Sequence, residues 1–423
     1  MDGSATRLRA ATLYLEAASS QALKREELLD LFSDTLVDKI DCEEVARDGG
    51  FLVVPIAQGT DRISTYLRHV PERYLTAVRE KRSWLVFDHS GEGPNFHRQE
   101  AQRIHAALND MGIAPAQVIY INQSRDYGPD YSAWCNAQAV DQRFHVLLYD
   151  YYIKRFFLRS WDDRPAEFAR RRQAFLQRDR LGRAFVCLNF KPRPWRTALL
   201  TWIIRDGLWD RGFISFGGFD RGAVPMIEGS IVWSKSGGPI QQFLDLAVSE
   251  GCEAPLAALV EKGRIFFANH GKDATGRNKG RLLDMAGDIY RQSAFSLVSE
   301  TAMMPTMRRI SEKPCRALSN GHPLILFGGF RNLQLIRNLG FQTFSDWIDE
   351  GYDEISDPES RFRAAYGAFQ DFLPRAETAV LTDKKLQDLL LFNLEHAFFG
   401  IQKKYDSEID PAFCDALRRA AQD

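Results

Sequence analysis

Short apolar runs of strand length alternate with stretches of helical periodicity along most of this chain, and this alternation most constrains its fold. A strand, a helix and a second strand at such spacing form a βαβ unit, whose two strands are parallel. The pattern therefore predicts an α/β protein with helices on the faces of parallel sheets. The expected strands are residues 51–56, 84–87, 118–121, 184–190, 212–216, 264–268, 295–298 and 323–327, and the clearest helices are 100–110, 194–208, 240–249, 279–291 and 332–338.

The middle of the chain, residues 150–180, has no strand signal and is rich in arginine and aromatic residues. We therefore expect a helical connection between two Rossmann-like domains. Apolar residues at helical spacing within 5–40 predict one or two further helices at the start of the chain. The expected domains are 1–175, 176–383 and a set of C-terminal helices, 384–423, for which packing back on the first domain is left open.

Composition excludes several classes of protein. The 423 residues are 45% hydrophobic with a net charge of −1, which suits a globular protein and gives no sign of a nucleic-acid partner. Six scattered cysteines without C-x-x-C spacing argue against a zinc ribbon and suit a reducing compartment. With no secretion signal or membrane-spanning run visible, we expect a cytoplasmic protein and leave a peripheral membrane contact open.

Arginines cluster locally at 170–172 and again at 178, 180 and 183. We interpret this cluster as the solvated face of the connecting helix.

The block from 295 to 330 holds the most informative polar residues. Its first apolar run ends in Ser299 and Glu300, and a second apolar run, 323–327, follows a short helix. Polar side chains at the carboxyl ends of parallel strands lie where α/β sheets bind ligands.

The short helix between these two runs begins at a typical N-cap, Ser311. Its first turn offers free N–H groups and the charge of Lys313 to a phosphate, with Arg316 one turn further on. Glu312 is suited to accept hydrogen bonds from ribose hydroxyls. The alternative is an ordinary helix start, where a Glu-Lys pair is common.

Two further groups have both a functional and a plain interpretation. His322, before Pro323, can donate to an anion or, when protonated, assist a leaving group; alternatively it is a turn residue. Asn189, Lys191 and Arg193 follow the first strand of the second domain, where an arginine can grip a pyrophosphate in a bidentate manner. The alternative for these three residues is a basic loop without a ligand.

In the first domain, the loop after residues 84–87 occupies the equivalent strand end. Asp88 or Glu92 is a candidate general base for an acceptor hydroxyl, with His89 as a rival. One strand later, residues 122–126 offer groups suited to a sugar, although a plain surface loop is an equal alternative. The sequence contains no phosphate loop, dinucleotide fingerprint, zinc-protease motif or nucleophile elbow, and no D-x-D pair for a metal–diphosphate complex.

Two α/β halves with phosphate-binding groups in the second resemble the GT-B glycosyltransferases, which implies two domains facing a cleft. The block S-E-T…S-E-K-P-C-R-A-L…G-H-P-L-I-L-F-G is similar to the donor-site region of fucosyltransferase-like bacterial enzymes. The resemblance implies that Glu300 and Glu312 face the donor's sugar and ribose and that Lys313 faces its diphosphate. Ser-Glu-Thr stands where Phe-Glu-Asn is usual, and the His-Pro pair is similar to that of transferases using CMP-activated acidic sugars.

These observations predict a metal-independent glycosyltransferase without a cofactor. It would move a sugar from a nucleotide-sugar donor to a glycan or glycolipid acceptor, in the assembly of a bacterial surface polysaccharide. The alternative is a non-catalytic nucleotide- or glycan-binding module of the same fold, whereas a hydrolase would need a nucleophile or metal cluster that the sequence does not offer. The expected catalytic residues are Asp88, Glu92 and His322, and the expected donor-binding residues are Asn189, Lys191, Arg193, Ser299, Glu300, Glu312, Lys313 and Arg316.

Overall fold

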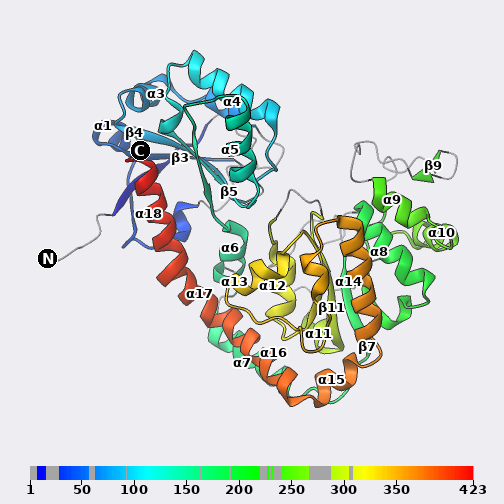
Figure 1. Cartoon of the computed structure of the whole chain (residues 1–423). Helices are drawn as coiled ribbons and strands as arrows, with labels where there is room; N and C mark the ends of the chain where they lie inside the picture. Colours follow the sequence, from blue (N-terminus) through cyan, green and yellow to red (C-terminus); the bar gives the residue numbers. More distant parts are fainter. Residues whose placement is uncertain are drawn as a thin grey trace. The chain divides into compact units, whose positions relative to one another are not determined.

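Parallel strands form the two main sheets of the protein, and each sheet belongs to its own unit of the chain (Figure 1). Unit 1 comprises Met1–Arg155, Thr306–Arg309 and Gln402–Asp423, and unit 2 comprises Phe156–Pro305 and Ile310–Ile401. The expected α/β class is confirmed. The computed structural model describes residues 7–15, 28–56, 62–91, 93–159, 161, 163–189, 192–219, 226–227, 230–231, 241–265, 287–303 and 308–422.

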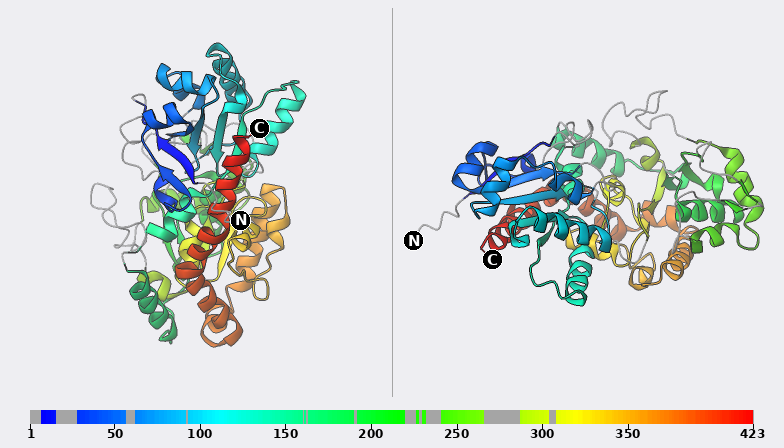
Figure 2. Two further views of the ribbon diagram at one scale, coloured as in Figure 1. Left: turned by 90° about the vertical axis from the view of Figure 1, so that its left-hand side faces the viewer. Right: turned by 90° about the horizontal axis from the view of Figure 1, so that it is seen from above.

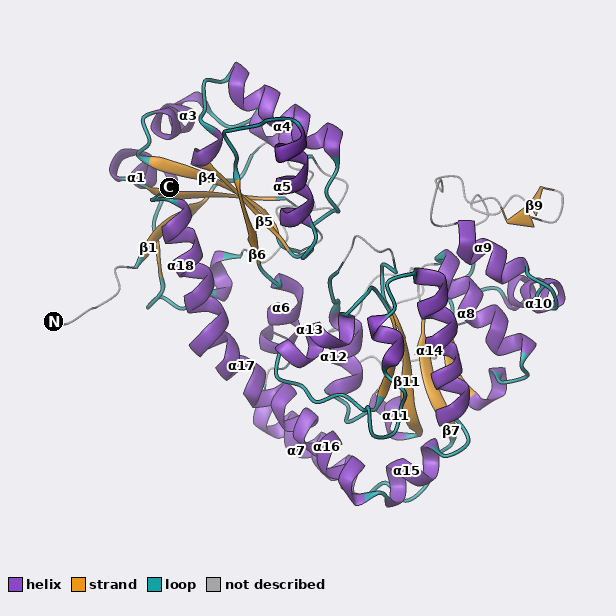
Figure 3. Ribbon diagram, in the orientation of Figure 1, coloured by secondary structure: helices purple, strands orange, loops and turns teal. Residues whose placement is uncertain are grey.

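The sheet of unit 1 has six strands in the order β2-β1-β3-β4-β5-β6, and all neighbouring pairs are parallel (Figure 3). The strands are β1 (Leu8–Thr12), β2 (Val37–Lys39), β3 (Gly50–Pro55), β4 (Ser83–His89), β5 (Val118–Asn122) and β6 (His145–Leu148). The helices that belong to this unit or begin in it are α1 (Cys42–Asp48), α2 (Ile63–Leu67), α3 (Glu72–Arg79), α4 (Arg98–Asp110), α5 (Tyr127–Ala137), α6 (Tyr151–Arg159) and α18 (Asp410–Ala420).

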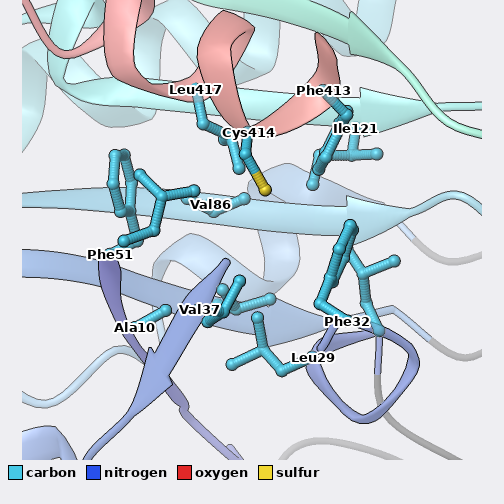
Figure 4. Close-up of a pocket in the computed structure, with 13 residues that line it drawn as sticks. Ala10, Leu29, Phe32, Val37, Phe51, Val86, Ile121, Phe413, Cys414 and Leu417 are labelled. Carbon is cyan, nitrogen blue, oxygen red and sulfur yellow. The ribbon is translucent and has the colours of Figure 1, made fainter. Parts of the chain in front are cut away.

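Both faces of this sheet are buried, because its central strands are apolar at nearly every position. In β3, Leu52 and Val54 point to one face and join a core with α1–α5. Phe51 and Val53 point to the opposite face and line a small cavity closed by α18 (Figure 4). Unit 1 is therefore a three-layer α/β/α structure, which Figure 2 shows from two further directions.

A buried ion pair fixes α18 within unit 1. The ammonium group of Lys154, in α6, donates to the Asp410 carboxylate and to the carbonyl of Leu31. Tyr149 donates to the other carboxylate oxygen of Asp410 at 2.9 Å. Burial lowers the pKa of Lys154 and raises that of Asp410, although the attraction between the two groups opposes both shifts. Removing either partner would leave an unpaired buried charge, which costs more than the pair itself contributes.

The start of the chain corrects the expectation of N-terminal helices. In the described part of 5–40, β1 and β2 are strands, and a single 3₁₀ turn, Leu29–Leu31, lies between them. Leu8 and Ala10 are buried on one face of β1 and Ala11 on the other. Pairing of β1 with β2 and β3 therefore outweighed the helical spacing of the leucines, as tertiary context often does. Residues 16–27 lie outside the described part.

Replacing Leu29 by alanine should lower the free energy of unfolding by about 2–5 kcal/mol, because it enlarges a cavity in a close-packed layer. Leu29 is 7% exposed, and the cavity that it lines has a volume of only about 20 Å³. Leu148→Ala is the matched control: at 44% exposure it should change stability by less than about 0.5 kcal/mol. Urea unfolding followed by tryptophan fluorescence measures both, and equal losses would contradict this packing.

The main sheet of unit 2 has the order β12-β11-β7-β8, again wholly parallel, and a short antiparallel hairpin, β9-β10, stands apart from it. The strands are β7 (Arg183–Leu188), β8 (Gly212–Ser215), β9 (Met226–Ile227), β10 (Ser230–Ile231), β11 (Ser293–Ser299) and β12 (Leu324–Phe327). The helices are α7 (Arg164–Leu176), α8 (Pro194–Arg205), α9 (Gln241–Val248), α10 (Glu253–Lys262), α11 (Gly287–Arg291), α12 (Glu312–Leu318), α13 (Asn332–Asn338), α14 (Pro358–Phe372), α15 (Ala376–Thr382) and α16 (Lys384–Glu395). The short helix α17 (Ile401–Lys404) begins at the last residue of unit 2 and continues in unit 1.

Aromatic side chains join α14 to this sheet. Phe369 lies 5.2 Å from the Phe185 ring and 6.1 Å from the Phe295 ring, centroid to centroid, so α14 packs against both β7 and β11. Phe362 contacts Phe327 at the end of β12 in the same way, at 5.3 Å.

Most expected elements of unit 2 are present at the expected places. Of the expected strand 264–268, only an isolated bridge between Phe216 and Ile265 is described, and 266–286 lie outside the described part. None of the helices in the described part of the chain has the length and apolar character needed to cross a bilayer.

Candidate functional site

The connections of unit 2 create a ligand-binding position at the carboxyl edge of its sheet. The chain runs from β7 to β8 on one side and returns with β11 on the other side of β7. The loops that leave β7 and β11 therefore diverge from neighbouring strand ends. Open parallel sheets bind ligands at such a switch point. Asn189 and Arg193 follow β7, and Glu300 follows β11, so the topology brings these predicted residues to one edge.

The carboxylate of Glu300 is almost wholly engaged by its own loop. Its two oxygens accept from the Ser311 N–H at 2.8 Å, the Ser311 hydroxyl at 2.6 Å and the Thr301 N–H at 3.1 Å. Glu300 is 2% exposed, and its own N–H donates to the carbonyl of Phe327. In this geometry Glu300 joins the end of β11 to the start of α12.

Lys313 lies directly beside this junction. Its ammonium group donates to the hydroxyls of Thr301, at 3.2 Å, and Ser311, at 3.1 Å, and lies 3.4 Å from the Glu312 carboxylate. Burial opposes the charge on Glu312, but Lys313 and Arg316 outweigh it and lower the pKa of this carboxyl to about 2. Glu312 is therefore an anion at neutral pH, able to accept hydrogen bonds but not to donate them.

Two buried oxygen atoms at the strand ends have no hydrogen-bond partner among the described residues. They are Oδ1 of Asn189, whose residue is 1% exposed, and Oγ of Ser299, whose residue is 2% exposed. Buried polar atoms are nearly always paired in folded proteins, so these two oxygens are acceptors that a polar ligand reaching the strand ends could use. Lys191 lies outside the described residues.

Two guanidinium groups lie close together at the start of α8. Arg196 is buried and donates to the carbonyls of Ser299 and Glu300, both at 3.2 Å. Burial and the charge of neighbouring Arg193 lower the pKa of Arg196 to about 10. An anion bound here would relieve the repulsion between the two arginines.

Arg361, a residue that the sequence analysis did not single out, binds the loops at this edge of the sheet. It is 1% exposed and donates to the carbonyls of Gly328 at 2.9 Å, Met303 at 2.8 Å and two residues before α14. Four carbonyls are thus paired by one side chain, and the loops after β11 and β12 are held in place. No motif around Arg361 in the sequence indicates this role.

The start of α13, which follows β12, is already occupied by a carboxylate. Asp353 accepts from the N–H groups of Leu333 at 3.0 Å and Gln334 at 3.2 Å. This helix end therefore has little capacity left for a ligand anion.

His322 lies at the opposite, amino edge of the sheet, in a core environment. It is fully buried; its Nε2 lies 2.5 Å from the Tyr290 carbonyl, and its Nδ1 lies 3.1 Å from the Ser296 hydroxyl. These partners fit a neutral ring that donates through Nε2 and accepts through Nδ1. Burial and the charge of Arg178 lower the pKa of His322 to about 3. The geometry therefore gives no support to the predicted role in proton donation to a leaving group.

This lowered pKa predicts a pH-dependent contribution to stability. The unfolded chain protonates His322 near pH 6.5 and the folded chain only near 3, so its contribution is complete above 6.5 and declines as the pH falls. The stability difference between wild type and His322→Gln should shrink by about 1.4 kcal/mol per pH unit below 6.5. Urea unfolding between about pH 7.5 and 5.5 measures this, and a constant difference would contradict the buried neutral ring.

In unit 1, Asp88 is the penultimate residue of β4 and is 3% exposed. Its Oδ1 accepts from both the N–H and the hydroxyl of Ser90, at 3.0 and 2.5 Å. The next residue, His89, has its Nδ1 3.0 Å from the Tyr120 hydroxyl. The same hydroxyl accepts a hydrogen bond from the Asn122 side chain at 3.0 Å. His89 is thus part of a buried network. Glu92 lies outside the described residues.

Residues 308 and 309, which group with unit 1, hold the neighbouring loops of its sheet. Arg308 donates to both Asp126 oxygens, from Nε at 2.6 Å and from its backbone N–H at 2.8 Å. Arg309 donates to the carbonyl of Gly93 at 2.9 Å. A Cβ at Gly93 would lie 2.1 Å from Oδ1 of Asn122, so only glycine fits there.

The described residues contain no group of three metal-ligating side chains. Fold and site together define an α/β protein with a polar, partly cationic edge on its second parallel sheet. No protein-family model matches the chain, and no curated protein matches its sequence. Among solved structures, an alpha,alpha-trehalose-phosphate synthase (UDP-forming) from Burkholderia vietnamiensis aligns over 99% of this chain and 98% of its own, with 10% identity and a TM-score of 0.40. A likeness of that size carries no argument about function, which rests on the residues above.

Proposed function

We propose that this protein is a glycosyltransferase that transfers a sugar from a nucleotide-sugar donor to a glycan or glycolipid acceptor without a metal ion. The observation that carries the proposal is the pair of buried oxygens at the switch point of unit 2, Asn189 Oδ1 and Ser299 Oγ, at the same sheet edge as Arg193 and Lys313. A donor's hydroxyl and phosphate groups would supply the missing partners. That the ligand is a nucleotide-sugar is inferred from the resemblance of the S-E-T…S-E-K block to the donor sites of glycosyltransferases.

In this proposal Lys313 and Arg193 neutralise the diphosphate as it leaves. Such electrostatic stabilisation is commonly the largest catalytic contribution. Glu312 accepts hydrogen bonds from the ribose, and Asn189 and Ser299 bind polar atoms of the donor. Glu300 then acts mainly as a positioning residue, because its carboxylate is engaged by Ser311 and Thr301.

On the acceptor side we propose Asp88 as the general base. The two hydrogen bonds that it accepts from Ser90 both fall on Oδ1 and fix its orientation. Synthesis of a surface polysaccharide in the bacterial cytoplasm is the pathway class that we assign to this activity.

Lys313→Ala should weaken binding of the nucleotide diphosphate by about 10- to 100-fold, because a charge-assisted hydrogen bond contributes about 1.5–3 kcal/mol. Lys384→Ala is the control, since Lys384 lies on α16 with a side chain 76% exposed. Thermal-shift titration with UDP, GDP and CMP identifies the base, and calorimetry then compares the variants.

Slow hydrolysis of the matching nucleotide-sugar by wild type, with loss in Lys313→Ala, would support the transferase. Binding without hydrolysis or transfer would favour a non-catalytic binding module. Equal nucleotide affinity in wild type and Lys313→Ala would contradict the placement of the site.

A further inference from the structure

One surface of unit 2 combines exposed apolar side chains with arginines and has no part in the candidate site. Six large apolar residues are exposed in the described chain, and three of them lie on α7, α16 and the π-helical turn after α16. These are Leu176 at 54%, Phe392 at 42% and Phe399 at 41% exposure. We call this surface the α7–α16 face, made by these three residues with Phe168 and Arg172.

The two helices that carry the α7–α16 face contact each other. α7 packs against α16 and against the turn His396–Gly400, and Figure 1 shows the two helices side by side. The rings of Phe168 and Phe399 meet edge to face, with 5.1 Å between their centroids. Phe168, Arg172 and Leu176 also border a shallow hollow along α7. Packing within unit 2 therefore leaves Leu176, Phe392 and Phe399 exposed.

The charge around the face is positive. Residues 163–180 contain six arginines and three acidic residues, in a chain whose net charge is −1. Arg171 points inward to the carbonyl of Ser319 and to Glu167, which also pairs with Arg170. Arg172 and Arg180 are exposed and form no ion pair within the described chain. Their charge is available to an anionic partner.

We propose that the α7–α16 face binds a membrane surface that contains anionic lipids. Helices that lie in a bilayer interface carry phenylalanine and leucine on one face, bordered by arginine or lysine. Basic clusters beside such a face are attracted to acidic lipid head groups. A shallow surface of convex helices suits a bilayer better than a peptide, which needs a groove or a sheet edge. The inference goes beyond the proposed transfer reaction and does not depend on it.

The test is sedimentation of the full-length protein with vesicles of phosphatidylcholine, with and without phosphatidylglycerol. Wild type should bind the anionic vesicles, and added salt should weaken binding. Arg172→Glu should weaken it by about tenfold or more, because the charge is reversed at the surface. Leu176→Ser combined with Phe399→Ser should weaken binding to a similar extent.

Matched controls are Arg211→Glu, an exposed arginine elsewhere in unit 2, and Val260→Ser, an exposed apolar residue at 39% on α10. Both should bind vesicles like wild type, and circular dichroism should confirm that every variant is folded. Failure of wild type to bind, or equal binding by all variants, would overturn the proposal. A dimer that Leu176→Ser and Phe399→Ser dissociate, without vesicle binding, would overturn it in favour of a protein interface.

Discussion

A single buried carboxylate, that of Glu300, joins the end of β11, the loop that follows and the start of α12. The N–H and hydroxyl of Ser311 and the N–H of Thr301 satisfy its two oxygens. Such a group is stable in the interior only with these partners, because an unpaired buried charge costs several kcal/mol. The same two residues also position Lys313, because its ammonium group donates to the hydroxyls of Thr301 and Ser311.

This arrangement changes the role that the resemblance implied for Glu300. The protein takes three of the four acceptor positions of the Glu300 carboxylate, two on Oε2 and one on Oε1. Because Glu300 is only 2% exposed, a donor hydroxyl would reach the remaining position only if the surrounding loop moved. The oxygens of Asn189 and Ser299 have no partner among the described residues, and our proposal therefore assigns the donor contacts to them before Glu300.

The strands were predictable where the chain is apolar without interruption. Residues 118–121 and 295–298 read as buried parallel strands and are so, because sheets covered on both faces need apolar residues at every position. β1 was missed because Ala10 and Ala11 suit a helix equally well, and the pairing partners that decide it lie far along the chain. β6 begins with a histidine and is only half buried, so its apolar signal was weak.

The site was predictable to the extent that it is local in sequence. Ser311 is the N-cap of α12, as its spacing from the apolar runs indicated. Arg361 could not be found this way, because its role depends on four carbonyls that only the folded chain brings together. His322 was misleading for the same reason: next to a proline it suits a turn or a site, and only its burial against Tyr290 shows a neutral core ring.

Parallel strands impose a difference between the two edges of the unit 2 sheet. Every strand–helix loop leaves from the carboxyl edge, so polar groups accumulate there, including Arg193, Glu312 and Lys313. The amino edge receives the chain from the preceding helices, and His322 at this edge stays neutral in the core. Because one sheet separates these environments, a charged ligand can be held at the carboxyl edge while the opposite edge is packed for stability. The placement of the candidate site residues in this sheet therefore follows from strand direction before it follows from any single motif.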